Sequence, residues 1–429
     1  MTLTLYQIIA TGIIFMLCLV LVYSYKPFQI QGFPRFVGLS VFLFKILFIL
    51  LNIYIYTAVY ENKAESDIYK YFQDGSAIAS YAYDDFSGYL RVLFGFENEK
   101  DLLYLKQNTN HWFKAYEEFS LNENRLVIRF HALLGPLTQN AYPAHAILAS
   151  FLSYLGSLLL HKSWRNYFSS TPKLWLAATF LVPSLLFWTG AVLKESFVIL
   201  GLGLCIYGLF ATSNKLYTIG GLLLILFSKE YIFIAILPLI AAHLIQKNLK
   251  PGMAQSYLLS ITLSIIVIFL ISRYSSLDFF QIIHKKQEAF MNVSNLNNAQ
   301  SRFEVPIIQP NLYSILLNSP HALFNALFRP LIWEWKSVLY FFSGMEVMGI
   351  IAIGFYAVWT KKIRNAHLWE LEPFWFSLYF TVILCLMIGL TVDNSGSIAR
   401  YRMPIITFVL AIFLLLLQKN KTDDLVSKV

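Results

Sequence analysis

Lysine and glutamate stand next to each other at two points where one apolar run of the chain ends and the next begins. Lys194-Glu195 lies at the first of these points and Lys229-Glu230 at the second. A charged side chain close to hydrocarbon costs about 3 kcal/mol unless it faces a partner or a water-filled cavity. The two pairs therefore predict polar turns between membrane helices, facing a pocket at one membrane surface.

A third polar turn precedes the last apolar run and carries Asp393, Arg400 and Arg402. An arginine guanidinium can bind phosphate through two parallel hydrogen bonds. The turn therefore predicts a site for the phosphate of an anionic lipid. Asp393 could instead pair with one of the two arginines.

Two acids stand early in the first long polar segment. Asp67 and Asp74 are about two helical turns apart, so they share one face if this stretch is helical, with Tyr71 between them. Asp67 follows a membrane helix by only a few residues, where a carboxylate could reach a lipid headgroup or a sugar attached to it. As a general base it could accept the proton of an attacking hydroxyl. The alternative interpretation is that both are solvated loop acids.

Two arginines follow later in the same segment. Arg125 and Arg129 are four residues apart, so in a helix they stack on one face. They could bind phosphate, or they could pair with the acids Glu117 and Glu118.

The second long polar segment predicts an amphipathic helix lying on the outer leaflet. Ser319-Pro320 marks its expected start, and Pro330 should kink it. Arg329 would point along the headgroup plane, either to bind phosphate or only to reach water. The apolar stripe of this helix consists of Leu323, Leu327, Leu331 and Trp335.

The composition places all these residues in a membrane protein. The chain is 57% hydrophobic and 13% charged, whereas a soluble domain carries roughly 25% charged residues. We expect an all-α polytopic membrane protein, with residues 1–429 as a single membrane domain and about eleven helices of near-bilayer length. Their predicted ranges are 7–24, 36–60, 143–160, 174–191, 195–211, 216–228, 231–246, 254–272, 337–358, 373–392 and 402–418.

Two long segments, residues 61–142 and 273–336, interrupt this series. Lysine and arginine gather in short linkers on the other side, which the positive-inside rule assigns to the cytoplasm. The long segments, the polar turns and the N-terminus then face outward, and the C-terminus is cytoplasmic. The net charge of +9 comes mainly from those linkers, and no concentrated basic arm predicts nucleic-acid binding.

The acidic segment after an early membrane helix, the polar turn 183–195 and the run Arg400-Tyr401-Arg402 resemble the polytopic GT-C glycosyltransferases. The similarity is to divergent bacterial members near the mannosyltransferase and aminoarabinose-transferase group. The resemblance implies a bacterial inner-membrane enzyme that takes a polyprenyl-phosphate sugar as donor and a glycan, lipid or protein as acceptor. Some members bind a divalent cation, which here would be Mg²⁺ or Mn²⁺.

By position, Asp67 matches the catalytic base of this family, and Asp74 is its substitute. The donor-phosphate residues would be Arg400, Arg402, Lys194 and Arg329. The acceptor or a secondary site would use Lys229, Glu195, Arg125 and Arg129. The sequence departs from the family pattern at two points, because the usual Asp-Glu pair is Asp67-Ile68 here and because an extra membrane helix precedes the one leading into the acidic loop.

Two other functions stay open. An envelope-polysaccharide polymerase or ligase has the same layout of helices and long outer loops, and its site would consist of Arg125, Arg129, His131 and Arg302. A lipid-linked-sugar transporter or a non-enzymatic membrane subunit is the third reading. Transporters place polar residues near the bilayer midplane, often in broken helices, whereas most charges here fall at the ends of apolar runs.

Overall fold

The computed structural model describes residues 3–59, 66–113, 122–275, 277–296, 301–334, 337–360 and 366–418, and the regular structure within these ranges is helical. The nearest approach to a strand among them is one isolated antiparallel bridge between Arg302 and Asn394. The predicted all-α class is therefore confirmed for the described part of the chain.

Within the described residues, eight helices are long and apolar enough to cross a membrane. Several keep large apolar side chains on the outside, such as Leu5 and Ile13, which are 74% and 63% exposed. Contiguous apolar surface of this kind suits lipid rather than water. The eight helices support a membrane protein, and the count of about eleven stays a prediction. The candidate spans are Leu5–Ser24, Arg35–Ala58, Tyr142–Phe168, Glu230–Leu249, Met253–Tyr274, Val338–Thr360, Glu372–Thr391 and Ser395–Leu416.

The chain divides into two compact units. Unit 1 comprises Met1–Ser163, Thr179–Leu181 and Leu185–Glu230, and unit 2 comprises Trp164–Ala178, Val182–Ser184 and Tyr231–Val429. The single membrane domain expected for residues 1–429 stays a prediction.

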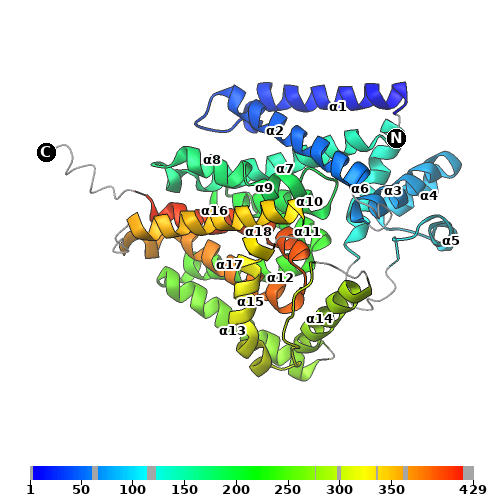
Figure 1. Ribbon diagram of the computed structural model, residues 1–429. Coiled ribbons are helices and arrows are strands. Elements are labelled where there is room, and N and C mark those ends of the chain that lie inside the picture. The colour runs from blue at the N-terminus through cyan, green and yellow to red at the C-terminus, as the bar shows by residue number, and fades with distance from the viewer. Residues whose placement is uncertain are drawn as a thin grey trace. The chain divides into compact units, whose positions relative to one another are not determined.

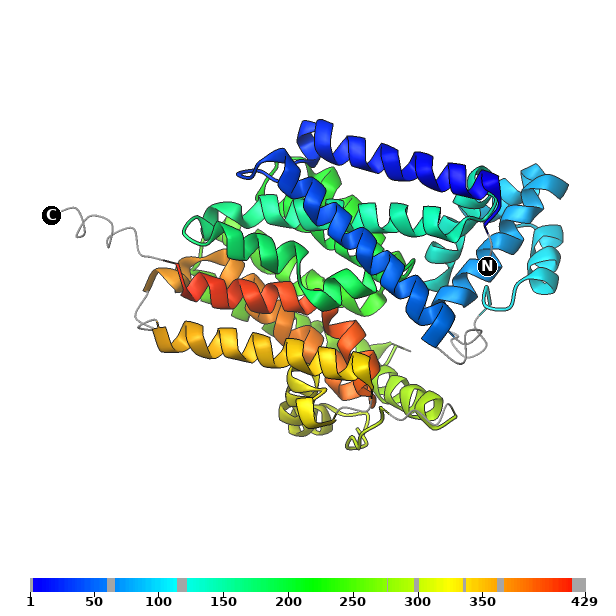
Figure 2. The same ribbon diagram turned by 45° about the horizontal axis from the view of Figure 1, so that its top comes forward.

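Unit 1 is built from the N-terminal helices. In it α1 and α2 run side by side (Figures 1 and 2), and Thr4 begins α1 with a capping box in which Gln7 is the partner. Its main helices are α1 (Leu5–Ser24), α2 (Arg35–Tyr54), α3 (Asp67–Asp84), α4 (Phe86–Phe94), α5 (Glu99–Asn108), α6 (Asn124–Thr138), α7 (Tyr142–Trp164), α9 (Pro183–Trp188), α10 (Lys194–Phe210) and α11 (Lys215–Ser228).

Helices α3 and α6 pack closely because a glycine of each lies at the contact. A Cβ on Gly75 would lie 2.4 Å from the Cβ of His131, and one on Gly135 would lie 2.4 Å from the Cβ of Ala79. No side chain fits at such distances, so both positions require glycine. This contact fixes the acidic helix α3 against the helix that carries Arg125.

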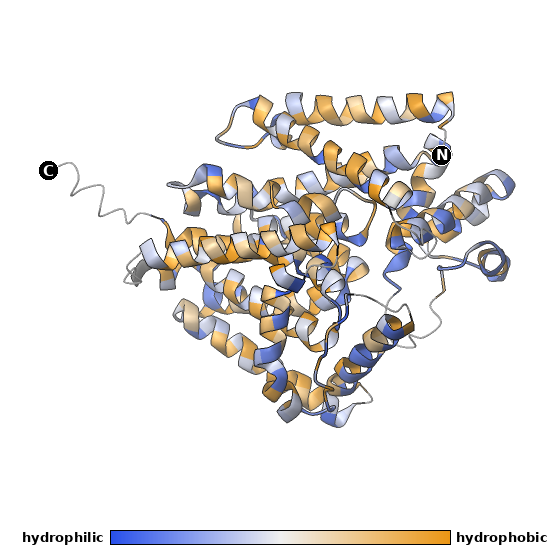
Figure 3. Cartoon of the chain, in the orientation of Figure 1, coloured by the Kyte–Doolittle hydropathy of each residue, from blue (hydrophilic) through white to orange (hydrophobic). Residues whose placement is uncertain are grey.

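Unit 2 holds the later spans. In it α16 and α18 run side by side (Figure 2). Helix α16 is apolar along nearly its whole length, whereas α14 carries many hydrophilic residues (Figure 3). The main helices are α8 (Pro172–Phe180), α12 (Glu230–Leu249), α13 (Met253–Tyr274), α14 (Phe279–Leu296), α15 (Leu312–Phe328), α16 (Val338–Thr360), α17 (Glu372–Thr391) and α18 (Ser395–Leu416).

The helix predicted at 174–191 is wrong as a single element. It is broken into α8, which ends at Phe180, and α9, which begins at Pro183. Proline has no backbone N–H to continue the ladder, and it disfavours the helical conformation in the residue before it. Pro183 therefore interrupts a run that is apolar enough to look continuous.

The boundaries predicted for the amphipathic helix in the second long segment are also wrong. Helix α15 begins at Leu312, where the Asn311 side chain accepts a hydrogen bond from the Ser314 backbone, and Pro320 lies inside it. Pro330 lies beyond its end, because Arg329 adopts the extended conformation that a following proline favours. Pro330 thus follows the helix and does not kink it.

Candidate functional site

Glu123, Lys194, Glu195 and Lys229 form one group of charges in unit 1, called the charge cluster below. The Lys194 Nζ lies 2.9 Å from Oε2 of Glu123, and the Lys229 Nζ lies 3.4 Å from Oε1 of Glu195. Oε1 of Glu123 also accepts a hydrogen bond from the backbone N–H of Glu230, at 3.0 Å. Both lysines and Glu195 are buried. The two lysine–glutamate turns of the sequence therefore meet, and Glu123 joins them.

The cluster owes part of its geometry to the start of α10. Leu193 is extended and Lys194 is the first helical residue, so both charges of this turn fall in the first helical turn. A glutamate there is favoured by the partial positive charge of the helix N-terminus. Glu195 therefore contributes to the helix start as well as binding Lys229.

The turn before α10 is held in place by polar side chains of α2. Lys45 donates to the Thr189 hydroxyl at 2.8 Å, and the Asn52 amide donates to the Phe187 carbonyl at 2.7 Å. A Cβ on Gly190 would lie 3.0 Å from the Asn52 amide nitrogen. This close packing fixes the direction in which α10, and with it Lys194, leaves the turn.

The charges of the cluster largely compensate one another. Burial alone would raise the pKa of Glu123, but the positive charges of Lys194 and Lys229 and the hydrogen bonds from Lys194 and the Glu230 backbone outweigh it, so the pKa lies below its usual value. A phosphate could bind Lys194 only in competition with the Glu123 carboxylate.

Asp67 is the first residue of α3 and is half-buried. Tyr71, one turn later, is buried, and its hydroxyl donates to Oδ1 of Asn124 at 3.1 Å. The Lys194 Nζ lies 5.9 Å from the centre of the Tyr71 ring. Tyr71 therefore connects the helix that begins with Asp67 to the charge cluster.

Asp74 lies on α3 as well, so the predicted helical placement of both acids is confirmed. Its two carboxylate oxygens accept backbone hydrogen bonds from Asn110, at 3.0 Å, and His111, at 2.8 Å. The side chain is buried. Asp74 therefore holds residues 110–111 against α3. The same two oxygens would have to accept a proton if Asp74 acted as a base.

Arg125 and Arg129 both lie on α6, and both guanidinium groups lie over the ring of Trp112, at 4.9 and 5.1 Å from its centre. Arg129 pairs with Glu97 at 2.9 Å. The predicted stacking on one helix face is thus confirmed, whereas the proposed partners Glu117 and Glu118 lie outside the described residues. A cavity of about 300 Å³ is lined by Asn122, Arg125, Leu126, Arg129 and Phe227.

Arg402 lies on α18 in unit 2 and is buried. Its Nη1 donates to the carbonyls of Ala326, Leu327 and Arg329, at 3.0, 3.1 and 2.6 Å. These carbonyls belong to the last turn of α15 and its cap, where the helix has unpaired acceptors and a partial negative charge. Nε and Nη2 are also buried, and neither has a hydrogen-bond acceptor among the described residues.

The two other arginines expected at the donor phosphate, Arg329 and Arg400, also lie in unit 2. Arg329 pairs with Glu334 at 2.9 Å, and its guanidinium lies 4.1 Å from the centre of the Phe303 ring. Arg400 is half-buried and lies two residues before Arg402 on α18. The Arg329 side chain is therefore fixed by an ion pair with Glu334 and by the Phe303 ring, and does not simply extend toward the headgroup plane.

Asp393 pairs with Arg302, at 3.2 Å between Oδ2 and Nε. Its Oδ1 accepts a hydrogen bond from the Ser294 hydroxyl at 2.6 Å. The alternative in which Asp393 pairs with Arg400 or Arg402 is thus replaced by a pair with Arg302, because residues of the second long segment fold back onto the turn before α18. The pairing also occupies Arg302, a residue of the polymerase or ligase reading.

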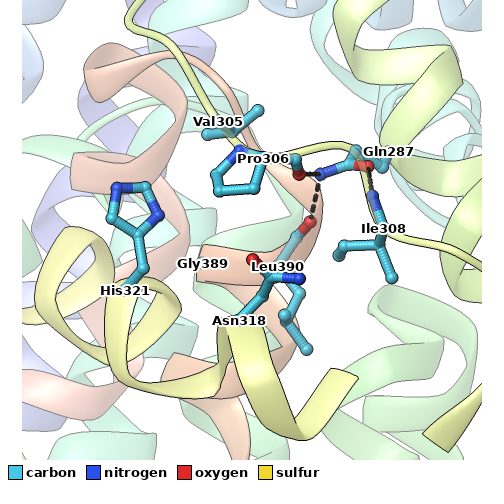
Figure 4. Close-up of a pocket in the computed structure, with 8 residues that line it drawn as sticks. All are labelled: Gln287, Val305, Pro306, Ile308, Asn318, His321, Gly389 and Leu390. Carbon is cyan, nitrogen blue, oxygen red and sulfur yellow. Dashed lines mark hydrogen bonds between the residues drawn. The ribbon is translucent and has the colours of Figure 1, made fainter. Parts of the chain in front are cut away.

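A small cavity in unit 2 is shown in Figure 4. Its volume is about 10 Å³, which is room for about one water molecule. Gln287 spans one wall, donating to the carbonyls of Pro306 and Leu390 and accepting from the backbone of Ile308. The amide is thus fully used in joining three segments, and the cavity is too small for a substrate.

Sequence reasoning passed over Glu123 and Lys45. Lys45 had a usable signal, since it is the single charge inside the apolar run of α2 after Arg35, and charges within membrane helices usually have a specific partner. Glu123 had none, because it stands among other polar loop residues and its partner Lys194 is 71 positions away.

Among the described residues no group of three or more His, Cys, Asp or Glu side chains could hold a metal ion. The divalent cation implied by the family resemblance has no ligand set there, so no step below depends on one.

The sequence-predicted residues thus fall into separate groups. Asp67, Asp74, Lys194, Glu195, Lys229, Arg125 and Arg129 belong to unit 1, while Arg329, Arg400 and Arg402 belong to unit 2. Convergence of Asp67 with Arg400 and Arg402 stays a prediction. No protein-family profile, no curated protein and no solved structure matches the chain.

Proposed function

We propose that the protein transfers a sugar from a polyprenyl-phosphate donor to an acceptor at the extracytoplasmic face of a bacterial inner membrane. The N-terminus would lie outside and the C-terminus in the cytoplasm, as the distribution of lysine and arginine predicts. Eight apolar helices supply a lipid setting for such a donor. The acidic helix α3 and the arginine helix α6 follow the second span, where an outward-facing site is expected.

The observation that carries this proposal is that Nε and Nη2 of the buried Arg402 have no hydrogen-bond acceptor among the described residues. Such a state is costly, since an unsatisfied buried donor loses about 1–3 kcal/mol and more when charged. A phosphate would satisfy Nε and Nη2 together through the paired hydrogen bonds that arginine forms with oxyanions. Because these atoms are shielded from solvent, the phosphate reaches them after a local opening of unit 2.

The proposed reaction is a single displacement at the anomeric carbon. Asp67 accepts the proton of the acceptor hydroxyl, the hydroxyl oxygen bonds to the anomeric carbon, and the bond from that carbon to the phosphate oxygen breaks. The electron pair stays on the phosphate, which leaves as polyprenyl phosphate while the sugar inverts. Positive charge at Arg402 acts where negative charge develops. Asp74 is the weaker candidate for the base, because both of its oxygens accept backbone hydrogen bonds.

The test uses the full chain in lipid nanodiscs and a panel of polyprenyl-phosphate sugars. Release of polyprenyl phosphate is measured for the wild type and for Asp67→Asn, with Asp84→Asn, an exposed acid at the other end of α3, as the matched control. We expect Asp67→Asn to slow release roughly 10²–10⁴-fold, with donor affinity unchanged and the control fully active.

Two results would contradict the proposal. Full activity of Asp67→Asn would remove Asp67 as the base. Donor binding by the wild type without any release would favour the transporter reading.

One observation favours the second candidate, an envelope-polysaccharide polymerase or ligase. Arg125 and Arg129 line a cavity, as a site built on them would need. Against it, His131 is fully buried and Arg302 is paired with Asp393. Glycan extension that survives Asp67→Asn but is lost in Arg125→Gln would select this candidate.

A further inference from the structure

The cavity in unit 1 is lined by both cationic and apolar side chains. Arg125 and Arg129 contribute positive charge to the lining, Leu126 and Phe227 contribute apolar surface, and Asn122 completes it. Phe227 is 50% exposed near the end of the apolar helix α11. A volume of about 300 Å³ is at the lower end of the range of small-molecule sites.

The two arginines differ in how their charge is balanced. Arg129 donates two hydrogen bonds, from Nη2 to the Glu97 carboxylate at 2.9 Å and from Nε to the Val92 carbonyl at 2.9 Å. Arg125 makes one hydrogen bond to a described residue, from Nε to the Trp112 carbonyl at 3.3 Å. Among the described residues, Nη1 and Nη2 of Arg125 have no hydrogen-bond acceptor, and both remain charged donors.

The Arg125 guanidinium is already held in position for a ligand. It lies over the Trp112 ring, and Trp112 is fully buried, so the ring is a fixed platform. Asn122 donates to the same Trp112 carbonyl at 2.7 Å, which ties the start of α6 to the platform. Arginine stacked in this way loses little conformational entropy on binding a ligand.

Electrostatics point to an anion. Burial and the neighbouring charge of Arg129 both lower the pKa of Arg125, with Glu97 acting in the opposite direction. A negative group beside Arg125 would relieve both effects. Two arginines at i and i+4 repel each other, and the ion pair of Glu97 is formed with Arg129.

We propose that this cavity binds a phosphate-bearing lipid, with Arg125 as the principal phosphate ligand and Phe227 and Leu126 against its apolar part. The site is additional to the donor-phosphate site proposed at Arg402 and depends only on binding. Loss of sugar transfer and loss of this site are therefore separate outcomes.

The test measures binding to the full chain in detergent by isothermal titration. The probes are dihexanoyl phosphatidate, dihexanoyl phosphatidylcholine and inorganic phosphate. The variants are Arg125→Gln, Arg125→Lys and Phe227→Ala, and the matched control is Lys106→Gln, which removes an exposed cation from α5 in the same unit.

We expect Arg125→Gln to weaken phosphatidate binding roughly 10–100-fold, as for a lost hydrogen bond to a charged group, and Arg125→Lys to weaken it less. Phe227→Ala should weaken phosphatidate and leave inorganic phosphate unchanged, and Lys106→Gln should match the wild type. Phe227 is half exposed, so its replacement leaves folding intact and keeps the test decisive if Arg125→Gln is unstable.

Two results overturn the proposal. Equal affinity of Arg125→Gln and the wild type for phosphatidate would remove the site. Equal affinity of phosphatidate and inorganic phosphate, with no effect of Phe227→Ala, would show a free-phosphate site and overturn the lipid assignment.

Discussion

His131 and His145 meet through their Nδ1 atoms, which lie 2.7 Å apart in the buried contact between α6 and α7. Thr138 gives its hydroxyl proton to the Leu134 carbonyl at 2.9 Å, so its oxygen accepts from Nε2 of His145 at 2.8 Å. With that tautomer assigned from the hydrogen bonds, Nδ1 of a neutral His145 is an acceptor and His131 donates to it. Nε2 of His131 then carries a lone pair, and it has no partner among the described residues.

This arrangement predicts that the protein loses stability as the pH falls below about 6.5, the ordinary pKa of histidine. Burial lowers the pKa of His131 well below that value, and the neighbouring His145 adds to the effect. Below pH 6.5 the histidine is protonated in the unfolded chain and neutral in the folded chain. The free energy of unfolding therefore falls by about 1.4 kcal/mol for each unit by which the pH is lowered. Melting temperatures at pH 7.5, 6.5 and 5.5 measure the effect.

The variant His131→Gln should show a shallower pH dependence than the wild type. His321→Gln is the control, because His321 is exposed and contacts Asn325 of its own helix. Identical pH profiles for wild type and His131→Gln would contradict the prediction.

The pair Glu123–Lys194 is predicted to stabilise unit 1 only as a pair. Removing one partner leaves the other charge buried, which costs about 3–5 kcal/mol. We expect Glu123→Gln and Lys194→Met each to be strongly destabilising and the double variant to be much less destabilised than their sum. Denaturant unfolding of the four proteins gives the coupling free energy, and strict additivity would count against the pairing.

Acid should weaken the same pair. The pKa of Glu123 is lower in the folded protein than its usual value. Its contribution is therefore present above pH 4.5, the ordinary pKa of an unfolded glutamate, and is lost as the pH falls through the folded pKa. The stability difference between wild type and Glu123→Gln should therefore shrink below that pH. Unfolding curves at pH 6, 4.5 and 3.5 check the direction.

Asp74 is predicted to hold backbone rather than to act in the reaction. Asp74→Asn keeps one acceptor oxygen and loses the other, so one of the amides of Asn110 and His111 loses its partner. We expect a loss of about 1–3 kcal/mol in stability and faster hydrogen exchange at residues 110–111. Asp84→Asn is the control on the same helix. A variant with unchanged exchange but lost sugar transfer would instead make Asp74 the base.

Arg402 is predicted to have two separable functions. Its Nη1 bonds to the end of α15 are structural, so Arg402→Met should lower the melting temperature by several degrees. Arg402→Lys keeps a charge but not the paired donors, so it should keep more of the stability and still bind polyprenyl phosphate weakly. Lys285→Met, an exposed cation of α14, controls for loss of charge. An unchanged melting temperature for Arg402→Met would rule out the structural part.

Local signals in the sequence predicted the helices well. Long apolar runs gave α1, α13, α16 and α17 nearly to the residue, because twenty apolar residues without a breaker have few alternatives in a membrane. The error at Pro183 arose because a break two residues long does not lower the average hydropathy. The error in α15 arose because Asn311, a strong cap, lies nine residues before Pro320, where the sequence pattern predicts the start.

The candidate site was less predictable, because it depends on contacts between residues far apart in the chain. The meeting of the two lysine–glutamate turns followed from their place at helix ends, but the partner of Lys194 did not. The burial of Asp74 against residues 110–111 and the bonds from Arg402 to the end of α15 follow from tertiary packing alone. Side-chain type and spacing therefore marked several of the right residues and gave few of their partners.

Lys45 sets a condition on how the protein is made. Its ammonium lies in the middle of the second span, and its hydroxyl partner Thr189 comes 144 residues later. At about 5–20 residues per second of synthesis, α2 waits roughly 7–30 seconds for that partner. During this interval the second span is a poor candidate for release into lipid, so its insertion should depend on retention at the translocon or on an insertion chaperone until the turn before α10 arrives.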